Sequence, residues 1–133
     1  MYEHGIGVKS NYEIAMKWYR KAADQGFPFA ESNLGIMYET GRGVMIDYKE
    51  ALKWYSKAAS QGNAFAQYKL GRIYERGLAV KKDLIEAYSW YWLSAQHGDK
   101  GAQESMTRLK TVLTEEQINK AIKHASDLKK DIN

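Results

Sequence analysis

The stretch that decides the fold is LGIMYETGRGVMIDYKEALKWYSKAASQG, which runs from Leu34 to Gly62. It recurs in altered form 36 residues later, beginning at Leu70, and its second part also occurs 36 residues earlier. The first 26 residues match residues 37–62 at 16 of 26 positions. Residues 27–62 match the next 36 residues at 15 positions. A repeat of this length predicts stacked supersecondary units.

The bulk composition is that of an ordinary globular protein. Of 133 residues, 44% are hydrophobic and 27% are charged, and no apolar run approaches the roughly 18 residues of a membrane span. The absence of cysteine excludes disulfides, thiolate metal sites and a cysteine nucleophile. The net charge of +4 favours solubility and adds a weak attraction to acidic partners.

The first eight residues, MYEHGIGV, match the middle of a repeat and lack the charged start and apolar core of a signal peptide. We therefore expect the chain to begin within a repeat of a longer protein, and the compartment is left open. The expected organisation is a single solenoid domain over residues 1–133. Its parts are a partial repeat (1–26), two repeats (27–62 and 63–98), and a degenerate helix with a capping helix (99–133).

Apolar residues spaced three and four apart predict helices throughout, and no strand pattern competes with them. The expected helices cover residues 11–26, 28–40, 47–62, 64–76, 83–97, 100–111 and 114–130. The glycine pairs Gly5–Gly7 and Gly41–Gly43 are read as turns between helices. They do not resemble a phosphate loop, because no strand precedes them and no G-K-[ST] follows.

Several helix ends carry capping residues. Asn11 is a plausible N-cap, and Asp47 and Asp83 are each followed by a glutamate three residues later, which outlines a capping box. Thr114 and Gln117 form the same pattern before the last helix. Gly35 lies inside a helix, and we expect a neighbouring helix to approach it closely at Ala51.

With these positions in place, the sequence resembles the Sel-one-like repeat (SLR) family, a relative of the tetratricopeptide repeat. The family pattern stands in this chain at Ala30, Leu34, Gly35, Tyr38, Gly41, Gly43, Val44, Asp47, Ala51, Trp54, Tyr55, Lys57, Ala58, Ala59 and Gly62. The next copy keeps most of the pattern and departs from it at Ala79, Leu93 and Ser94. The match covers roughly residues 1–110, and the final helix looks like the capping helix of such arrays.

The resemblance implies an all-α fold: an α-solenoid of antiparallel helix pairs in a right-handed superhelix with a C-terminal capping helix. It also implies a non-enzymatic scaffold or adaptor that binds a partner protein or peptide on its concave face. No membrane span and no nucleic-acid partner are expected. The oligomeric state is left open, with end-to-end contacts between solenoid ends as the alternative to a monomer.

The groups that could carry chemistry recur with the repeat. Trp18, Trp54 and Trp90 lie in the apolar stripe and are expected in the core, although the face around Trp18 could be an artificial edge. Glu39 and Glu75 recur at one position and are read as a solvated or partner-facing row. The three histidines are scattered, without the spacing of a metal site. We therefore expect no catalytic residue, no metal and no cofactor.

Partner-binding residues should lie on the glycine-bearing helices, outside the packing stripe, at positions that change between repeats. Aromatic residues and arginine are enriched at the energetic centres of interfaces. Phe29 and Phe65 have an equally good alternative role in closing contacts between repeats. The candidates are Phe29, Ser32, Asn33, Ile36, Glu39, Thr40, Phe65, Tyr68, Lys69, Arg72, Glu75, Arg76, Glu104 and Arg108.

Two other functions remain as alternatives. Some cysteine-rich relatives in the family are associated with β-lactam binding or hydrolysis, but this chain has no cysteine and no S-x-x-K arrangement. Weak nucleic-acid binding through the basic surplus is the other alternative. Lysine and arginine are interleaved with acids, however, and form no continuous basic stripe.

Overall fold

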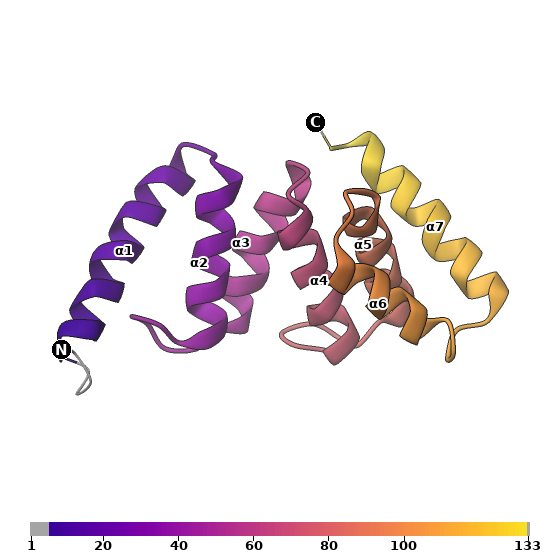
Figure 1. The fold of residues 1–133 in the computed structure, drawn as a ribbon, viewed down its shortest axis with the longest axis horizontal. Coiled ribbons are helices and arrows are strands. Elements are labelled where there is room, and N and C mark those ends of the chain that lie inside the picture. Colours follow the sequence, from indigo (N-terminus) through magenta and orange to yellow (C-terminus); the bar gives the residue numbers. More distant parts are fainter. Residues whose placement is uncertain (1–5, 133) are drawn as a thin grey trace.

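The computed structural model describes residues 6–132, and within this range it contains seven helices and no strand (Figure 1). The helices are α1 (Ile6–Asp24), α2 (Pro28–Thr40), α3 (Tyr48–Ser60), α4 (Ala64–Arg76), α5 (Leu84–Gln96), α6 (Lys100–Leu109) and α7 (Glu115–Lys130). The expected all-α helical-repeat architecture is confirmed.

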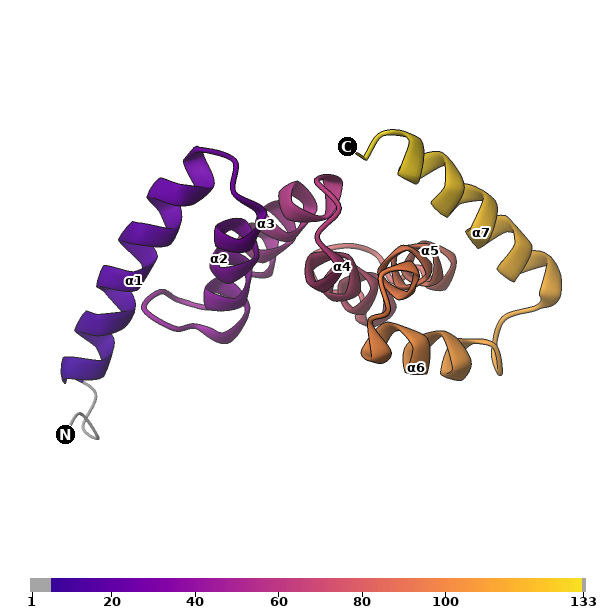
Figure 2. The same ribbon diagram turned by 45° about the horizontal axis from the view of Figure 1, so that its top comes forward.

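The helices are stacked in sequence order along the long axis of the molecule. From α1 to α6 each helix packs against the next, and α7 packs against α5. The two views in Figures 1 and 2 show α1 at one end of the stack and α7 at the other. A helix in such an array buries its apolar stripe mainly against sequence neighbours, which is the architecture of a solenoid.

Glycines end the first helix of each complete repeat, α2 and α4. Gly41 and Gly77 adopt left-handed conformations with φ of 75° and 70°, and their N–H groups donate to the carbonyls of Met37 and Ile73. Asp47 then caps α3 by accepting hydrogen bonds from the N–H groups of Lys49 and Glu50. These positions confirm the expected turn.

The capping boxes at Asp47 and Asp83 are only half formed, which corrects the expectation. In a complete box the third residue of the helix would accept from the N–H of the cap. Here the N–H of Asp47 donates to Tyr38 O, and that of Asp83 donates to Tyr74 O, both at 2.9 Å. Because each aspartate N–H already donates to a carbonyl of the preceding helix, it does not donate to the glutamate side chain that would complete the box. At Thr114, both halves of the box are present.

The close approach at Gly35 is made by Tyr55, not by Ala51 as the sequence suggested. A Cβ atom at Gly35 would lie 2.5 Å from Tyr55 Cε1. Gly71 meets Tyr91 at the same distance in the next repeat. The neighbouring helix was identified correctly, but its contact residue was not, because helix spacing does not say how far a side chain reaches across an interface.

The start of α1 also differs from the expectation. The helix begins at Ile6, so Asn11 lies inside it and is no N-cap, and Gly7 belongs to the helix. Gly5 lies outside the described residues. In the later repeats the equivalent turn is tied to the helix before it by tertiary hydrogen bonds. Among the described residues no helix precedes α1 that could accept such a hydrogen bond.

The three tryptophans do not share one environment. Trp54 and Trp90 are buried as expected, but 64% of Trp18 is exposed. Trp54 lies among Ala23, Ala30 and Leu34 of the preceding helices. No described helix precedes α1 to cover Trp18 in the same way. The core expectation was therefore wrong for Trp18, at the face already suspected of being an edge.

Helix α7 closes the array at its other end. Its apolar stripe, which includes buried Ala121 and Ala125, packs on the hydrophobic residues of α5. Ser89 of α5 donates a hydrogen bond to Ala121 O at 2.9 Å. The opposite face of α7 is charged, so the stack ends in a solvated surface, as the sequence predicted.

Candidate partner-binding face

The candidate residues lie on α2, α4 and α6, which occupy equivalent places in successive repeats. Phe29 is 61% exposed and its ring stands edge-on to Tyr19. Phe65 is 39% exposed and stands edge-on to Tyr55. Both phenylalanines therefore touch the preceding helix and still present a surface. Neither of the two roles considered for them is eliminated.

Along α2, the candidates differ in accessibility. Ser32 is buried, and its hydroxyl donates to Asn63 Oδ1 at 3.1 Å. It contacts Asn63, the N-cap of α4, and its burial removes it from the set that could face a partner. Asn33 and Thr40 remain partly or fully exposed, although each donates to a carbonyl one turn earlier, Phe29 O and Ile36 O respectively.

The repeated glutamates join three successive helices. Glu39 of α2 accepts a hydrogen bond from the buried Tyr55 hydroxyl of α3 at 2.7 Å. Lys69 Nζ of α4 lies 3.5 Å from the same carboxylate. The burial of Tyr55 and its bond to Glu39 raise the pKa of the phenol far above its ordinary value, so the hydroxyl remains a donor.

Glu75 repeats this arrangement with an arginine. It accepts from the Tyr91 hydroxyl of α5 at 2.7 Å and from both terminal nitrogens of the Arg108 guanidinium of α6. Burial alone would raise the pKa of Glu75. Hydrogen bonds from Arg108 and Tyr91, with the charges of Arg108 and Arg76, outweigh burial and lower this pKa. The carboxylate is therefore held in its charged form.

Five of the candidates surround one groove between α4 and α6. They are Tyr68, Arg72, Glu75, Arg76 and Arg108. The groove has a volume of about 420 Å³. The sequence placed these residues only on the glycine-bearing helices, outside the packing stripe. The structure brings them around a single concavity.

Two further residues line the groove that the sequence analysis missed. They are Tyr91 and Ser105, neither of which was among the candidates. Ser105 corresponds to Lys69 in the 36-residue register, so extending the register to this position would have found it. Glu104, which was a candidate, is exposed on α6 and does not line the groove.

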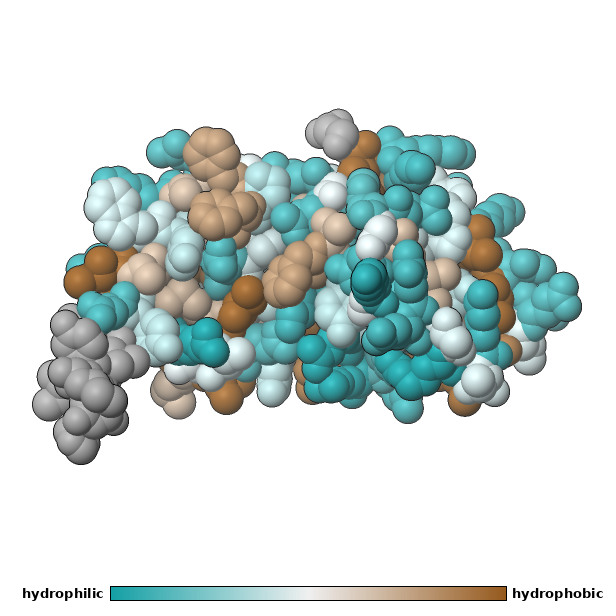
Figure 3. Space-filling view, viewed as in Figure 1, coloured by the Kyte–Doolittle hydropathy of each residue, from teal (hydrophilic) through white to brown (hydrophobic). Residues whose placement is uncertain are grey.

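The surface changes character along the molecule. On the face seen in Figure 3, apolar side chains gather over α1 and α2, whereas polar side chains cover the region of α6. Phe27 and Phe29 are among the exposed apolar residues at the first end. The groove between α4 and α6 therefore lies towards the polar end of the face formed by α2, α4 and α6.

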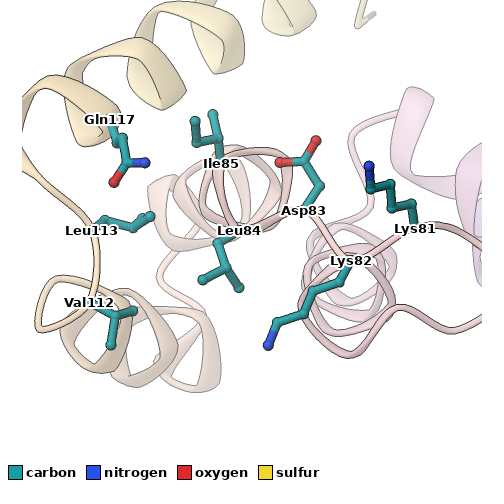
Figure 4. A pocket seen from close by; sticks show the side chains of 8 residues that line it. All are labelled: Lys81, Lys82, Asp83, Leu84, Ile85, Val112, Leu113 and Gln117. Atoms are coloured by element: carbon teal, nitrogen blue, oxygen red, sulfur yellow. The ribbon is translucent and has the colours of Figure 1, made fainter.

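A second concavity lies where the turn before α5 meets the connection between α6 and α7 (Figure 4). Lys81 and Lys82 stand on one side of it, and Val112, Leu113 and Gln117 stand on the other. None of the partner-binding candidates contributes to it. It does, however, supply a pair of exposed lysines that do not line the α4–α6 groove.

Residues 6–132 contain no group of three histidine, aspartate or glutamate side chains placed to hold a metal ion. No helix within them is both long enough and apolar enough to traverse a lipid bilayer.

The Sel1 repeat model matches the chain three times, over residues 1–27, 28–63 and 64–99. The chain belongs to the Sel1 repeat family. This confirms the resemblance drawn from the repeated motif. Sel1 repeats are typical of proteins that mediate protein interactions, generally as non-enzymatic scaffolds.

Solved structures agree with this assignment. One is c5321, a protective antigen present in uropathogenic Escherichia coli strains displaying an SLR fold, which is 31% identical with a TM-score of 0.89 over 98% of this chain and 28% of that one. Another is a Sel1 repeat protein from Oxalobacter formigenes, 46% identical with a TM-score of 0.70 over 79% of this chain and 43% of that one. The chain thus spans less than half of either protein. No curated protein sequence matches it.

Proposed function

We propose that this chain is a non-enzymatic interaction module that binds a protein or peptide partner on the concave face formed by α2, α4 and α6. The observation that carries the proposal is the groove lined by Tyr68, Arg72, Glu75, Arg76 and Arg108. The positions of Tyr68, Arg72 and Arg76 carry other residues in the preceding repeat, whereas the residues that build the stack stay fixed. Variation at exposed positions on a constant scaffold is how repeat proteins acquire specificity.

The chemical types in this row suit a protein partner. Tyrosine and arginine combine a large contact area with hydrogen bonding, and they are over-represented among residues that dominate binding energy. Exposed Phe29 and Phe65 supply apolar area on α2 and α4, the helices that also carry Ile36 and Tyr68. Such a mixed surface fits a peptide or protein edge better than a small apolar ligand.

A pull-down from native lysate tests the proposal. We expect the intact chain to retain a defined set of proteins, and the double variant Tyr68→Ala/Arg72→Ala to lose them. The matched control is Lys81→Gln/Lys82→Gln, which alters two side chains at the other concavity. Capture of the same proteins by all three folded chains would contradict a binding role for the groove.

The Tyr68 change needs a stability control, because the ring of Tyr68 lies 5.8 Å from that of buried Tyr91. We therefore expect the double variant to melt at a lower temperature than the wild type. Circular dichroism at the temperature of the pull-down checks that the variant is folded.

A further inference from the structure

The cations of the candidate face fall into two kinds. Lys69 is paired with Glu39, and Arg108 is paired with Glu75. Arg72 and Arg76 have no carboxylate within ion-pair distance in the part of the chain that the structure describes. Both line the α4–α6 groove. The groove therefore holds two guanidinium groups whose charge is not matched by the protein.

The neighbouring side chains hold this region in place. The Arg72 guanidinium lies over the Tyr68 ring, 6.0 Å from its centroid. Arg108 is bound to Glu75 and also donates to Ser105 Oγ at 3.2 Å. Glu75 is the one carboxylate that lines the groove, against three arginines, so the described lining keeps a net positive charge after Arg108 has paired with Glu75. A guanidinium donates paired hydrogen bonds that match the geometry of a carboxylate.

We propose that the groove between α4 and α6 binds an acidic peptide segment, with carboxylates of the partner paired to Arg72 and Arg76. This rests on the interaction function proposed above and names the chemical class of its partner. The complementary charge is the reason for the choice, since an uncompensated pair of arginines in a concavity attracts and orients acidic side chains.

A peptide fits the surroundings better than a nucleic acid. A nucleic acid presents an unbroken series of phosphates and requires a continuous basic track. Here Glu39 of α2 and Glu104 of α6 lie on the candidate helices before and after α4, which carries both arginines. Phe65, partly exposed on α4, adds an apolar contact for a peptide side chain. A short acidic segment can use the two arginines without meeting these carboxylates.

Fluorescence anisotropy with a defined probe tests the proposal. The probe is a fluorescein-labelled, C-amidated peptide of alternating glutamate and alanine, and its isostere carries glutamine in place of glutamate. We expect the acidic peptide to bind the intact chain and the isostere to bind at least about tenfold more weakly. The variant Arg72→Gln/Arg76→Gln should weaken binding of the acidic peptide by a similar factor, since close charge pairs carry coupling of this size.

The control Lys81→Gln/Lys82→Gln removes the same amount of positive charge from a different concavity. It should stay within about twofold of the wild type, because these exposed lysines do not line the α4–α6 groove and would form no direct pair with carboxylates of a peptide bound there. Equal weakening in both variants would show non-specific attraction and overturn the proposal. Equal binding of the acidic peptide and its isostere would do the same.

Two more outcomes are decisive. If duplex DNA binds the chain more tightly than the acidic peptide does, and if Arg72→Gln/Arg76→Gln weakens DNA binding, the groove binds nucleic acid and the proposal is wrong. If the acidic peptide fails while Tyr68→Ala/Arg72→Ala still loses proteins in the pull-down, the interaction function stands and only the acidic class is rejected. The two failures are therefore distinguishable.

Discussion

At the scale of single residues, the repeat depends on pairs of glycine and tyrosine. Gly71 lets α4 approach α5 so closely that the ring of Tyr91 lies over the glycine backbone, and Gly35 does the same for Tyr55. The buried phenols then reach Glu75 and Glu39 with their hydroxyls. Each glycine thus positions a tyrosine that in turn holds a glutamate of the candidate face.

Replacing Gly71 with alanine tests this pairing. The new Cβ would lie 2.5 Å from Tyr91 Cε1, and the ring is fully buried and cannot move aside. Overpacking of this kind costs more than the helix propensity gained from alanine, so we expect a net loss of about 2 kcal/mol in unfolding free energy. Chemical denaturation measures it.

Gly101→Ala serves as the control for that change. Its Cβ would meet Tyr68 Cε1 at 3.1 Å, and Tyr68 is only half-buried, so a small shift relieves the contact. We expect its unfolding free energy to stay within about 1 kcal/mol of the wild type. If Gly71→Ala were as stable as Gly101→Ala, the close approach would not be a constraint of the fold.

At the scale of elements, hydrogen bonds across helices compete with local capping. The N–H groups of Asp47 and Asp83 donate hydrogen bonds to carbonyls of the preceding helices, so their capping boxes are incomplete. Thr114, in contrast, has both halves of its capping box. Glu75 shows the same preference for partners on other helices, since it binds Tyr91 on α5 and Arg108 on α6. These contacts set the spacing of α4 and α6 around the groove.

Acid titration of Glu75→Gln tests that link. The pKa of Glu75 is lower in the folded chain than its ordinary value of 4.5. Its contribution to stability is therefore present above pH 4.5 and is lost as the pH falls through the folded value. We expect the unfolding free energy of Glu75→Gln to fall less than that of the wild type on acidification from pH 7.

Arg108→Gln checks the cause of this pH dependence, because the guanidinium is the main group that lowers the pKa of Glu75. We expect Arg108→Gln, like Glu75→Gln, to lose less unfolding free energy than the wild type on acidification. At pH 7, Glu75→Gln should cost about 1 kcal/mol, since the Tyr91 bond can persist and Arg108 is largely exposed. An acid response identical to the wild type in both variants would contradict the assigned role.

At the scale of the whole molecule, equivalent residues acquire different roles from their place in the stack. Trp18 and Trp54 occupy the same position of the repeat, yet their exposed fractions are 64% and 2%. The helix pair before α3 covers Trp54, and no described element covers Trp18. Stability is therefore carried by the contacts between neighbouring repeats.

The matched substitutions Trp54→Ala and Trp18→Ala measure this effect. Removing a buried tryptophan leaves a cavity and should cost about 3–5 kcal/mol, whereas the exposed one should change the unfolding free energy by about 0.5 kcal/mol or less. Thermal and chemical denaturation of the two variants provide the comparison. Similar losses at both positions would mean that Trp18 is covered in solution.

The sequence by itself determined the helices and their order. Apolar spacing, the left-handed glycines that follow α1 to α5 and the recurrence at 36 residues depend on neighbours within one repeat, which the sequence displays directly. It also placed Arg72, Arg76 and Arg108 among the residues at variable positions. Local chemistry was sufficient for these features.

Only the tertiary structure decided which residues meet. In the folded chain the residue that closely approaches Gly35 is Tyr55 and not Ala51. Ser32 is buried, Trp18 is exposed, and Arg108 binds Glu75. Ser105 also lines the groove. The reach of a side chain across an interface and the presence of a covering helix depend on packing between repeats. The 36-residue period of the sequence predicts neither the side-chain contacts between helices nor which helix covers a given residue.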